Sequence, residues 1–167
     1  MLLKDFIEKV NSVIEKVEFD KYFYWFIQKF DLNDKAKLLN LKKDNNLHSI
    51  RPRKGDIYLI DFGQNIGNEL CNTHMGIIIQ DSLKNSISST TIVIPISSSP
   101  KLYDTHEKIV ESDILVGKLN KLPSKAKVEQ IMCIDKARLI HKIGQVTPSF
   151  INRLEKRILK ILDIKKE

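Results

Sequence analysis

The first 17 residues show a helical pattern of apolar positions. Charged residues separate apolar ones that recur at steps of three and four: Leu3, Phe6, Ile7, Val10, Val13, Ile14 and Val17. This spacing puts the apolar side chains on one face of a helix of about four turns.

An aromatic-rich stretch follows at residues 22–30, and Asp31 or Asn33 stands where it can cap a third, short helix that carries Leu38, Leu39 and Leu41. We therefore interpret residues 1–50 as a helical N-terminal extension that packs on the rest of the chain or on a second copy. The alternative is that its aromatic side chains form a stacking platform for RNA bases, although aromatics at helical spacing usually fill cores.

The pattern changes after a polar linker at residues 43–49. Short runs of β-branched, aromatic and aliphatic residues, bounded by Gly, Ser, Asn or Pro, occur at 57–62, 75–80, 90–96, 113–119 and 127–134. Such runs are typical of strands. Because the connections between them are polar and show no helical pattern, we predict a closed antiparallel β-barrel in a second unit at residues 51–167.

A helix is predicted at the end of the chain. Thr147 is a suitable N-cap, and Pro148 suits the first helical position. The expected buried face consists of Ile151, Leu154, Ile158, Ile161 and Leu162, while Arg153, Lys156, Arg157 and Lys160 are expected mostly outside. The fold class is therefore α+β: an antiparallel barrel with a C-terminal helix, preceded by a helical extension.

Charge is unevenly distributed along the chain, whose net charge is +7. Residues 1–50 hold nine Lys or Arg against eight Asp or Glu, and residues 51–167 hold nineteen against thirteen. A basic surface attracts polyanions through counterion release, so the second unit is the better candidate for nucleic-acid binding.

Other features of the sequence narrow the class of protein. No apolar run approaches the ~20 residues needed to cross a bilayer, and the amino terminus lacks the apolar region of a signal peptide, so we expect a cytoplasmic protein. Cys71 and Cys133 form no CxxC motif and no cluster with metal-ligand spacing. We therefore predict no disulfide framework, no metal and no cofactor.

Four fragments in order resemble the MazF/PemK family of toxins. The first runs from Lys54-Gly55-Asp56-Ile57-Tyr58 through Asp61-Phe62-Gly63 and Asn65-Ile66-Gly67-Asn68-Glu69 to Ile77-Ile78-Ile79-Gln80. The second is residues 91–98, a strand that ends in serines. The third is Thr105-His106, with Asp104 where the family often has proline. The fourth is Val128-Glu129-Gln130-Ile131, continuing through residues 134–139 to Lys142-Ile143-Gly144.

This resemblance implies a homodimeric, metal-independent endoribonuclease on an SH3-like barrel. Such a toxin cuts single-stranded RNA in a groove across the dimer, and a cognate antitoxin blocks that groove. The ribose 2′-hydroxyl is the internal nucleophile. The chemistry needs a group to take the 2′ proton, charge or hydrogen-bond donors for the phosphorane, and a donor for the leaving 5′-oxygen.

The chain departs from the family at the reactive position, because His74 stands where arginine is expected. Imidazole titrates near neutrality and can accept or donate a proton. Our hypothesis is that His74 is the general base, that Ser97 is the hydroxyl donor in place of the usual threonine, and that His106 assists at the phosphate or contacts a base. Each of the three is also explained as an ordinary structural residue.

Further residues are predicted to bind substrate. Glu129 and Gln130 lie where the family reads bases, and Lys118, with Lys121, Lys125 and Lys127, is placed to contact phosphates. Asn65 and Glu69 belong to the loop of the first fragment, where a loop-fixing hydrogen bond is the alternative role for Glu69.

Two other functions stay open on the sequence. The same barrel architecture resembles that of CcdB-type gyrase inhibitors, which act by binding a protein, and a degenerate toxin that serves as a partner is a third alternative. The extension is also a candidate for a built-in antitoxin over the RNA groove, although its near-neutral charge differs from the acidic segments of free antitoxins.

Overall fold

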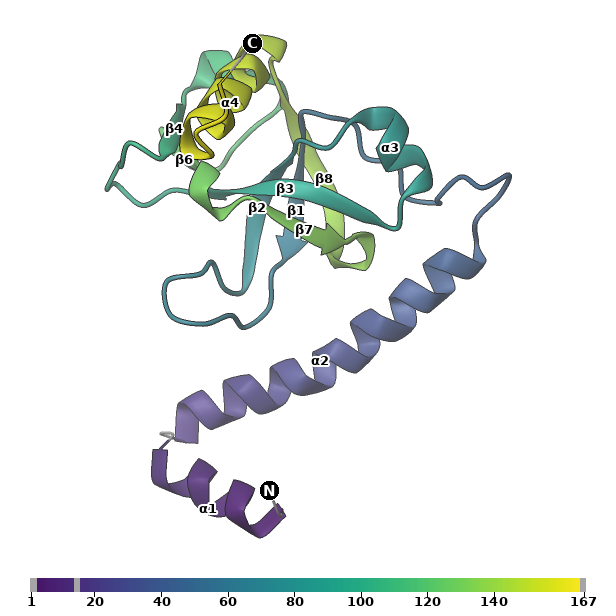
Figure 1. Cartoon of the computed structure of the whole chain (residues 1–167), viewed down its shortest axis with the longest axis vertical. Coiled ribbons are helices and arrows are strands. Elements are labelled where there is room, and N and C mark those ends of the chain that lie inside the picture. Colours follow the sequence, from purple (N-terminus) through teal and green to yellow (C-terminus); the bar gives the residue numbers. More distant parts are fainter. Residues whose placement is uncertain (1–2, 14–15, 166–167) are drawn as a thin grey trace.

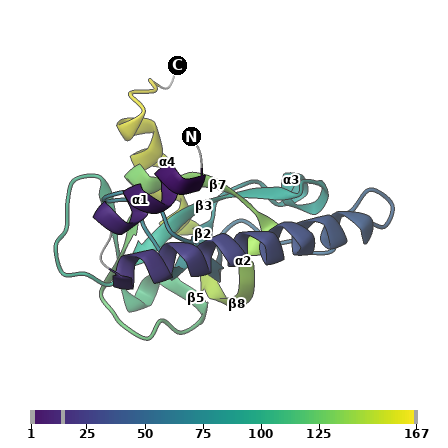
Figure 2. The ribbon, with the colours of Figure 1, turned by 90° about the horizontal axis from the view of Figure 1, so that it is seen from below.

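The computed structural model describes residues 3–13 and 16–165 of the chain. Two helices come first, α1 (Leu3–Val13) and α2 (Lys16–Leu41), and they lie beside the barrel rather than within it (Figures 1 and 2). Ile14 of the predicted first stripe lies outside the described residues.

The predicted third helix is wrong as a separate element, because α2 continues through Asp31 and Asn33 without a break. The stretch contains no Gly or Pro to end the helix. Trp25, Gln28, Leu32, Ala36 and Leu39 are all buried or half-buried, and their spacing of three and four keeps one face of α2 toward the barrel from Trp25 to Leu39.

The strands form one curved antiparallel sheet, and the α+β prediction is confirmed. They are β1 (Asp56–Asp61), β2 (Thr73–Ile78), β3 (Thr90–Ser97), β4 (His106–Ile109), β5 (Ile114–Gly117), β6 (Ser124–Lys127), β7 (Met132–Asp135) and β8 (Leu139–Val146). Their order in the sheet is β4-β6-β3-β2-β1-β8-β5, and β7 also pairs with β3.

The structure corrects three details of the predicted barrel. The sheet is curled but not closed, because its two end strands, β4 and β5, are not paired with each other among the described residues. A short helix, α3 (Ser82–Ile87), stands between β2 and β3, where Asp81 caps it by accepting hydrogen bonds from the backbone N–H groups of Leu83 and Lys84. The predicted strand at 127–134 is interrupted by the 3₁₀ turn η2 (Val128–Gln130), so its two ends pair with different parts of the sheet.

Side chains of the central strands alternate between two apolar cores. The larger core includes Ile57, Ile77, Ile94 and Ile96 and is closed by α4 (Pro148–Ile161) through Phe150 and Leu154. The smaller core lies on the other side of the same strands and consists of Ile60, Phe62, Ile78, Val93, Ile134 and Leu139. The sheet therefore has one face under α4 and a second face that α4 leaves uncovered.

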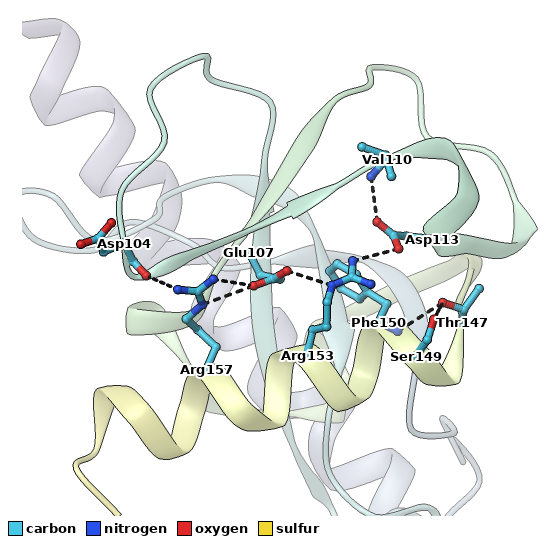
Figure 3. A network of polar contacts seen from close by, with 9 residues as sticks. All are labelled: Asp104, Glu107, Val110, Asp113, Thr147, Ser149, Phe150, Arg153 and Arg157. Atoms are coloured by element: carbon cyan, nitrogen blue, oxygen red, sulfur yellow. Dashed lines mark hydrogen bonds and ion pairs between the residues drawn. The ribbon is translucent and has the colours of Figure 1, made fainter.

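The C-terminal helix begins as predicted. The Thr147 hydroxyl accepts a hydrogen bond from the backbone N–H of Phe150, and Pro148 occupies the first turn. As expected, Arg153, Lys156 and Lys160 are exposed, and Arg157 is half-buried. The two arginines also form ion pairs at the surface: Arg153 donates to both Glu107 and Asp113, and Arg157 donates to Glu107 (Figure 3). Leu162, expected in the buried face, is exposed.

The extension is attached to the barrel at the end of β1. The ring of Trp25 is buried against Gly63, where a Cβ atom would lie 2.0 Å from the indole, and the Arg138 guanidinium stands 5.3 Å from the ring centroid. Farther along α2, the Lys35 ammonium donates to the carbonyl of Ala137 at 2.6 Å. Within residues 3–13 and 16–165, no helix is long and apolar enough to span a bilayer.

Candidate active site

His74 and Ser97 belong to the paired strands β2 and β3 and stand on the sheet face that α4 leaves uncovered. In the β2–β3 pair, Gly76 is opposite Pro95 and Ile78 is opposite Val93. This pairing ends at Gly76 and Pro95, so His74 and Ser97 each stand two residues beyond the last pair. Both follow the parity of Ile78 and Val93, so both side chains stand on the face of the smaller core.

Two lysines of β6, Lys125 and Lys127, stand on the same sheet face as Ser97. Ser97 is opposite Lys125, and Lys127 is opposite His106 on β4. Lys125 is buried, and its ammonium donates to the carbonyl of Lys101. Lys127 is half-buried on the same face and close enough for its charge to act on His74.

The environment of His74 favours a neutral imidazole. Burial lowers the pKa of His74 below its ordinary value of 6.5, and the positive charge of Lys127 lowers it further. A hydrogen bond with the Cys71 backbone acts in the opposite direction but is the smallest of the three effects. At neutral pH the ring is therefore able to accept a proton.

His106 is buried and uses both of its ring nitrogens. Nδ1 accepts a hydrogen bond from the backbone N–H of Tyr103 at 3.1 Å, so Nε2 carries the proton that it shares with Glu129 at 3.1 Å. The His106 side chain is 1% exposed, whereas that of Glu129 is 30% exposed. The arrangement holds the Glu129 carboxylate in place and leaves part of it open to solvent.

The loop between β1 and β2 is held by its own polar side chains and by Gln130. Asn65 donates through its amide to the carbonyl of Leu70 at 2.7 Å, and Glu69 accepts from the backbone N–H of Ile66. Gln130 accepts from the N–H of Leu70 at 3.1 Å and donates to the carbonyl of Asn68 at 2.9 Å. These bonds tie the loop to η2, next to Glu129.

Lys118 stands apart from the other predicted residues. It is exposed just after β5, and no hydrogen bond or ion pair among the described residues joins it to His74 or Ser97. Sequence reasoning also did not single out Lys127 from the neighbouring lysines. The alternation of side chains along β6 could distinguish Lys127 from the other lysines, because it decides which of them face His74. That alternation is informative only when the β3–β6 register is known.

His74 and Ser97 are both half-buried, so part of each residue remains accessible to solvent. One surface hollow lies along α4, and another lies between the linker and α3. Neither is lined by His74 or Ser97. Across the described ranges, no three His, Cys, Asp or Glu side chains are grouped as metal ligands would be. An open face with a neutral imidazole, a hydroxyl and an ammonium can accept a proton and stabilise a phosphoryl group of an extended polymer.

Comparison with known proteins places this chain in a family. Residues 53–162 match the model of the PemK-like, MazF-like toxins of type II toxin–antitoxin systems. No curated protein matches the chain at a significant level of sequence similarity.

Solved structures share the fold at low sequence identity. An endoribonuclease from a Mycobacterial species has a TM-score of 0.56 and 16% identity, with 71% of this chain and 97% of that chain covered. MazF from Deinococcus radiodurans has a TM-score of 0.57 and 11% identity, covering 70% of this chain and 100% of its own. The Mycobacterium tuberculosis toxin MazF-mt6 has a TM-score of 0.53 and 19% identity, covering 66% and 99%. With the family match over residues 53–162, these findings show that the chain belongs to the PemK-like, MazF-like toxins of type II toxin–antitoxin systems.

Proposed function

We propose that the chain is a toxin that cleaves single-stranded RNA by attack of the ribose 2′-hydroxyl, without a metal ion, and acts as a homodimer in the cytoplasm. The observation that carries this proposal is that the charge of Lys127 acts on His74, and that His74 and Ser97 stand on the same sheet face of the paired strands β2 and β3. A Mycobacterial endoribonuclease of this fold has been solved with its cognate antitoxin, with a TM-score of 0.54 and 17% identity over 70% of this chain and 98% of its own. We infer that a cognate antitoxin likewise neutralises this protein.

His74 is the general base of the proposed reaction. Its neutral ring takes the proton from the 2′-hydroxyl as the 2′-oxygen bonds to phosphorus. The bond from phosphorus to the 5′-oxygen then breaks, and that oxygen takes a proton from solvent water and leaves as a hydroxyl. The products are a 2′,3′-cyclic phosphate and a 5′-hydroxyl.

Ser97 and Lys127 stabilise the phosphorane. The Ser97 hydroxyl, on the same sheet face as His74, donates a hydrogen bond to a phosphoryl oxygen. Lys127 supplies the positive charge that arginine brings in other family members, as a point charge rather than a bidentate fork. In this arrangement a neutral His74 accepts the proton, and Lys127 carries the positive charge. An arginine is protonated at neutral pH, so a single arginine could supply the charge but could not accept the proton.

The remaining predicted residues bind or position substrate. His106 holds Glu129, whose exposed oxygen is available to a base edge. Gln130, Asn65 and Glu69 keep the β1–β2 loop in shape, because their side chains are committed to its backbone. Lys118 contacts a phosphate of the RNA that lies away from the cleaved bond.

The test is an RNA cleavage assay with purified protein, EDTA and a long single-stranded RNA of varied sequence. We expect discrete cuts that end in 2′,3′-cyclic phosphate, lost in His74→Ala and Ser97→Ala. His141→Ala is the matched control, because His141 is an exposed histidine on β8. Absence of cuts from well-folded protein would instead favour a binding module, with gyrase as the first partner to test.

The pH dependence of cleavage tests the role of Lys127 separately. Cleavage should fall as pH decreases through the lowered pKa of His74, because the protonated ring cannot accept the 2′ proton. Lys127→Ala removes a charge that lowers this pKa, so it should slow cleavage and move the acid limb to higher pH. An acid limb that stays in place would remove Lys127 from the site.

A further inference from the structure

The loop between β1 and β2 closes at a loop neck, which consists of Phe62, Gly63 and Asn72. The backbone N–H of Phe62 donates to the carbonyl of Asn72 at 3.0 Å, and the N–H of Asn72 donates to the carbonyl of Gly63 at 2.6 Å. Gly63 has φ +77° and Asn72 has φ +65°, so the chain enters the left-handed region on both sides of the neck. Because His74 comes two residues after Asn72, the loop neck decides how the chain enters β2 at that histidine.

Arg138 holds the end of β1 where the chain enters the loop neck. Its Nη1 donates to the carbonyls of Asp61 and Phe62, at 3.0 Å and 3.1 Å. The Asp61 carboxylate in turn accepts from the backbone N–H of Gly63 at 3.0 Å. The same guanidinium lies 5.3 Å from the ring centroid of Trp25, so Arg138 and Trp25 meet at the neck.

The indole of Trp25 covers the backbone of Gly63. A Cβ atom on Gly63 would lie 2.0 Å from Cζ2, 2.2 Å from Cη2 and 2.5 Å from Cε2 of the ring, which leaves no room for water between them. Trp25 is 5% exposed, although it comes from α2, which runs outside the barrel (Figure 1). Without the indole, water could compete for the hydrogen bonds of the loop neck.

The far part of the loop is held independently of Trp25. Gln130 is bonded to the backbone of Asn68 and Leu70, and residues 66–69 are exposed. A change at Trp25 should therefore act on the loop neck and on His74 rather than on the tip of the loop.

Trp25 comes from a segment outside the family match, which begins at residue 53. A helical extension can act on a reaction in two opposite ways. An inhibitor covers the groove and is removed to gain activity, whereas a support fixes the reacting groups and is needed for activity. The contact of Trp25 with the loop neck is of the second kind.

We propose that Trp25 is a positioning residue for RNA cleavage: α2 packs its indole on the loop neck and so fixes the entry of the chain into β2 at His74. The inference rests on the proposed function, in which His74 is the general base. The helical extension then supports cleavage and does not inhibit it.

The first experiment measures cleavage of single-stranded RNA by the full chain with Trp25 substituted. Trp25→Ala removes the indole and keeps a good helix former; kcat should fall about tenfold, because a displacement of about 1 Å can cost up to about a hundredfold. Trp25→Phe, which keeps a ring, should recover most of the rate. An unchanged or raised rate in Trp25→Ala would overturn the proposal.

Lys35→Ala is the matched control. Lys35 docks the same helix through the carbonyls of Ala137 and Leu139, and it lies about 15 Å farther along α2 than Trp25. This variant should keep the wild-type kcat. An equal loss of rate in Lys35→Ala and Trp25→Ala would overturn the specific role of Trp25 at the loop neck.

The pH dependence of cleavage separates positioning from a loss of folded protein. A smaller folded fraction lowers the amount of enzyme but leaves the acid limb in place. Burial is the largest of the effects that lower the pKa of His74, so a displaced ring gains water and its pKa moves toward 6.5. The acid limb of Trp25→Ala should therefore lie at higher pH than that of the wild type. A limb that stays in place would contradict the displacement of His74.

NMR tests the same displacement without cleavage, so a failure of the proposed function can be told from a failure of this inference. In Trp25→Ala the Asn72 amide hydrogen should exchange faster and the His74 imidazole should titrate at higher pH, while Lys35→Ala should match the wild type in both. Trp25→Leu, with a smaller loss of packing, carries the same expectations in a more stable protein. Absence of cleavage together with both changes would refute the proposed reaction but not the positioning of His74. If neither Trp25 variant changes the exchange or the titration, the inference is overturned.

Discussion

Gly63→Ala tests how the extension is attached to the barrel. The added methyl group would lie 2.0 Å from Cζ2 and 2.2 Å from Cη2 of Trp25, so the indole has to move. The residue also has φ +77°, a conformation that costs an L residue about 1–2 kcal/mol. The substitution therefore combines backbone strain with loss of the Trp25 contact.

Gly67→Ala separates these two effects. Gly67 has φ +60° in the same loop, but a Cβ there meets nothing within 4 Å. Both variants should lose about 1–2 kcal/mol of barrel stability from strain. Gly63→Ala should in addition lose most of the Trp25 packing, about 3 kcal/mol on the scale of buried aromatic truncations, or roughly a hundredfold in the docking equilibrium.

The assay is direct because Trp25 is the only tryptophan in the chain. In Gly63→Ala its emission should shift to longer wavelength, and amide hydrogens of α2 should exchange faster, since the hydrogen bonds of Lys35 alone do not replace the lost packing. Gly67→Ala should keep the wild-type emission. Identical emission from both variants would refute the close approach of Trp25 to Gly63.

Three further outcomes are expected from stability measurements in urea. Glu107→Gln should lower the free energy of unfolding by about 1 kcal/mol, because the carboxylate accepts from two partly exposed arginines of α4 (Figure 3). The loss should disappear at high salt, and no loss at low salt would refute the prediction. Lys136→Met should lower the free energy of unfolding by about 2–3 kcal/mol, because the fully buried ammonium donates to the carbonyls of Asn85 and Ser88 and the variant leaves both without that donor. A urea midpoint equal to that of the wild type would contradict this. Burial lowers the pKa of both His48 and His74, so the unfolded chain binds more protons than the folded chain as the pH decreases. The free energy of unfolding should therefore fall between pH 7.5 and pH 5.5, and it should fall less steeply in His48→Gln. Equal slopes for the two proteins would exclude His48 as a contributor.

The parts of the fold that local signals specify could be predicted from the sequence. Thr147 and Pro148 mark the start of α4 whatever surrounds them, and the predicted strand runs contain β1, β2 and β3 to within about two residues. β8 was not predicted, since its alternation of polar and apolar residues becomes a strand only when it pairs with β1 and β5. The length of α2 was missed because its aromatics lie on all sides and hide the helical period.

The candidate site was accessible to sequence reasoning only as a set of residues. The motifs pointed to His74 and Ser97, but that they stand on the same sheet face depends on the pairing of β2 with β3, which tertiary structure decides. The bond from His106 to Glu129 spans 23 residues and that from Leu70 to Gln130 spans 60, so no local pattern could indicate either contact.

The two-sided sheet has a consequence for how this protein can evolve. Successive side chains of β2 and β3 point to opposite faces, with Met75 and Ile96 in the core under α4 and His74 and Ser97 on the other side. A point substitution at position 74 or 97 therefore leaves the larger core intact, which makes a change of reactive group such as arginine to histidine accessible in a single step. An insertion or deletion of one residue in either strand would exchange the faces and destroy both at once. Across the family we expect this patch to vary in residue type while the lengths of the two strands stay fixed.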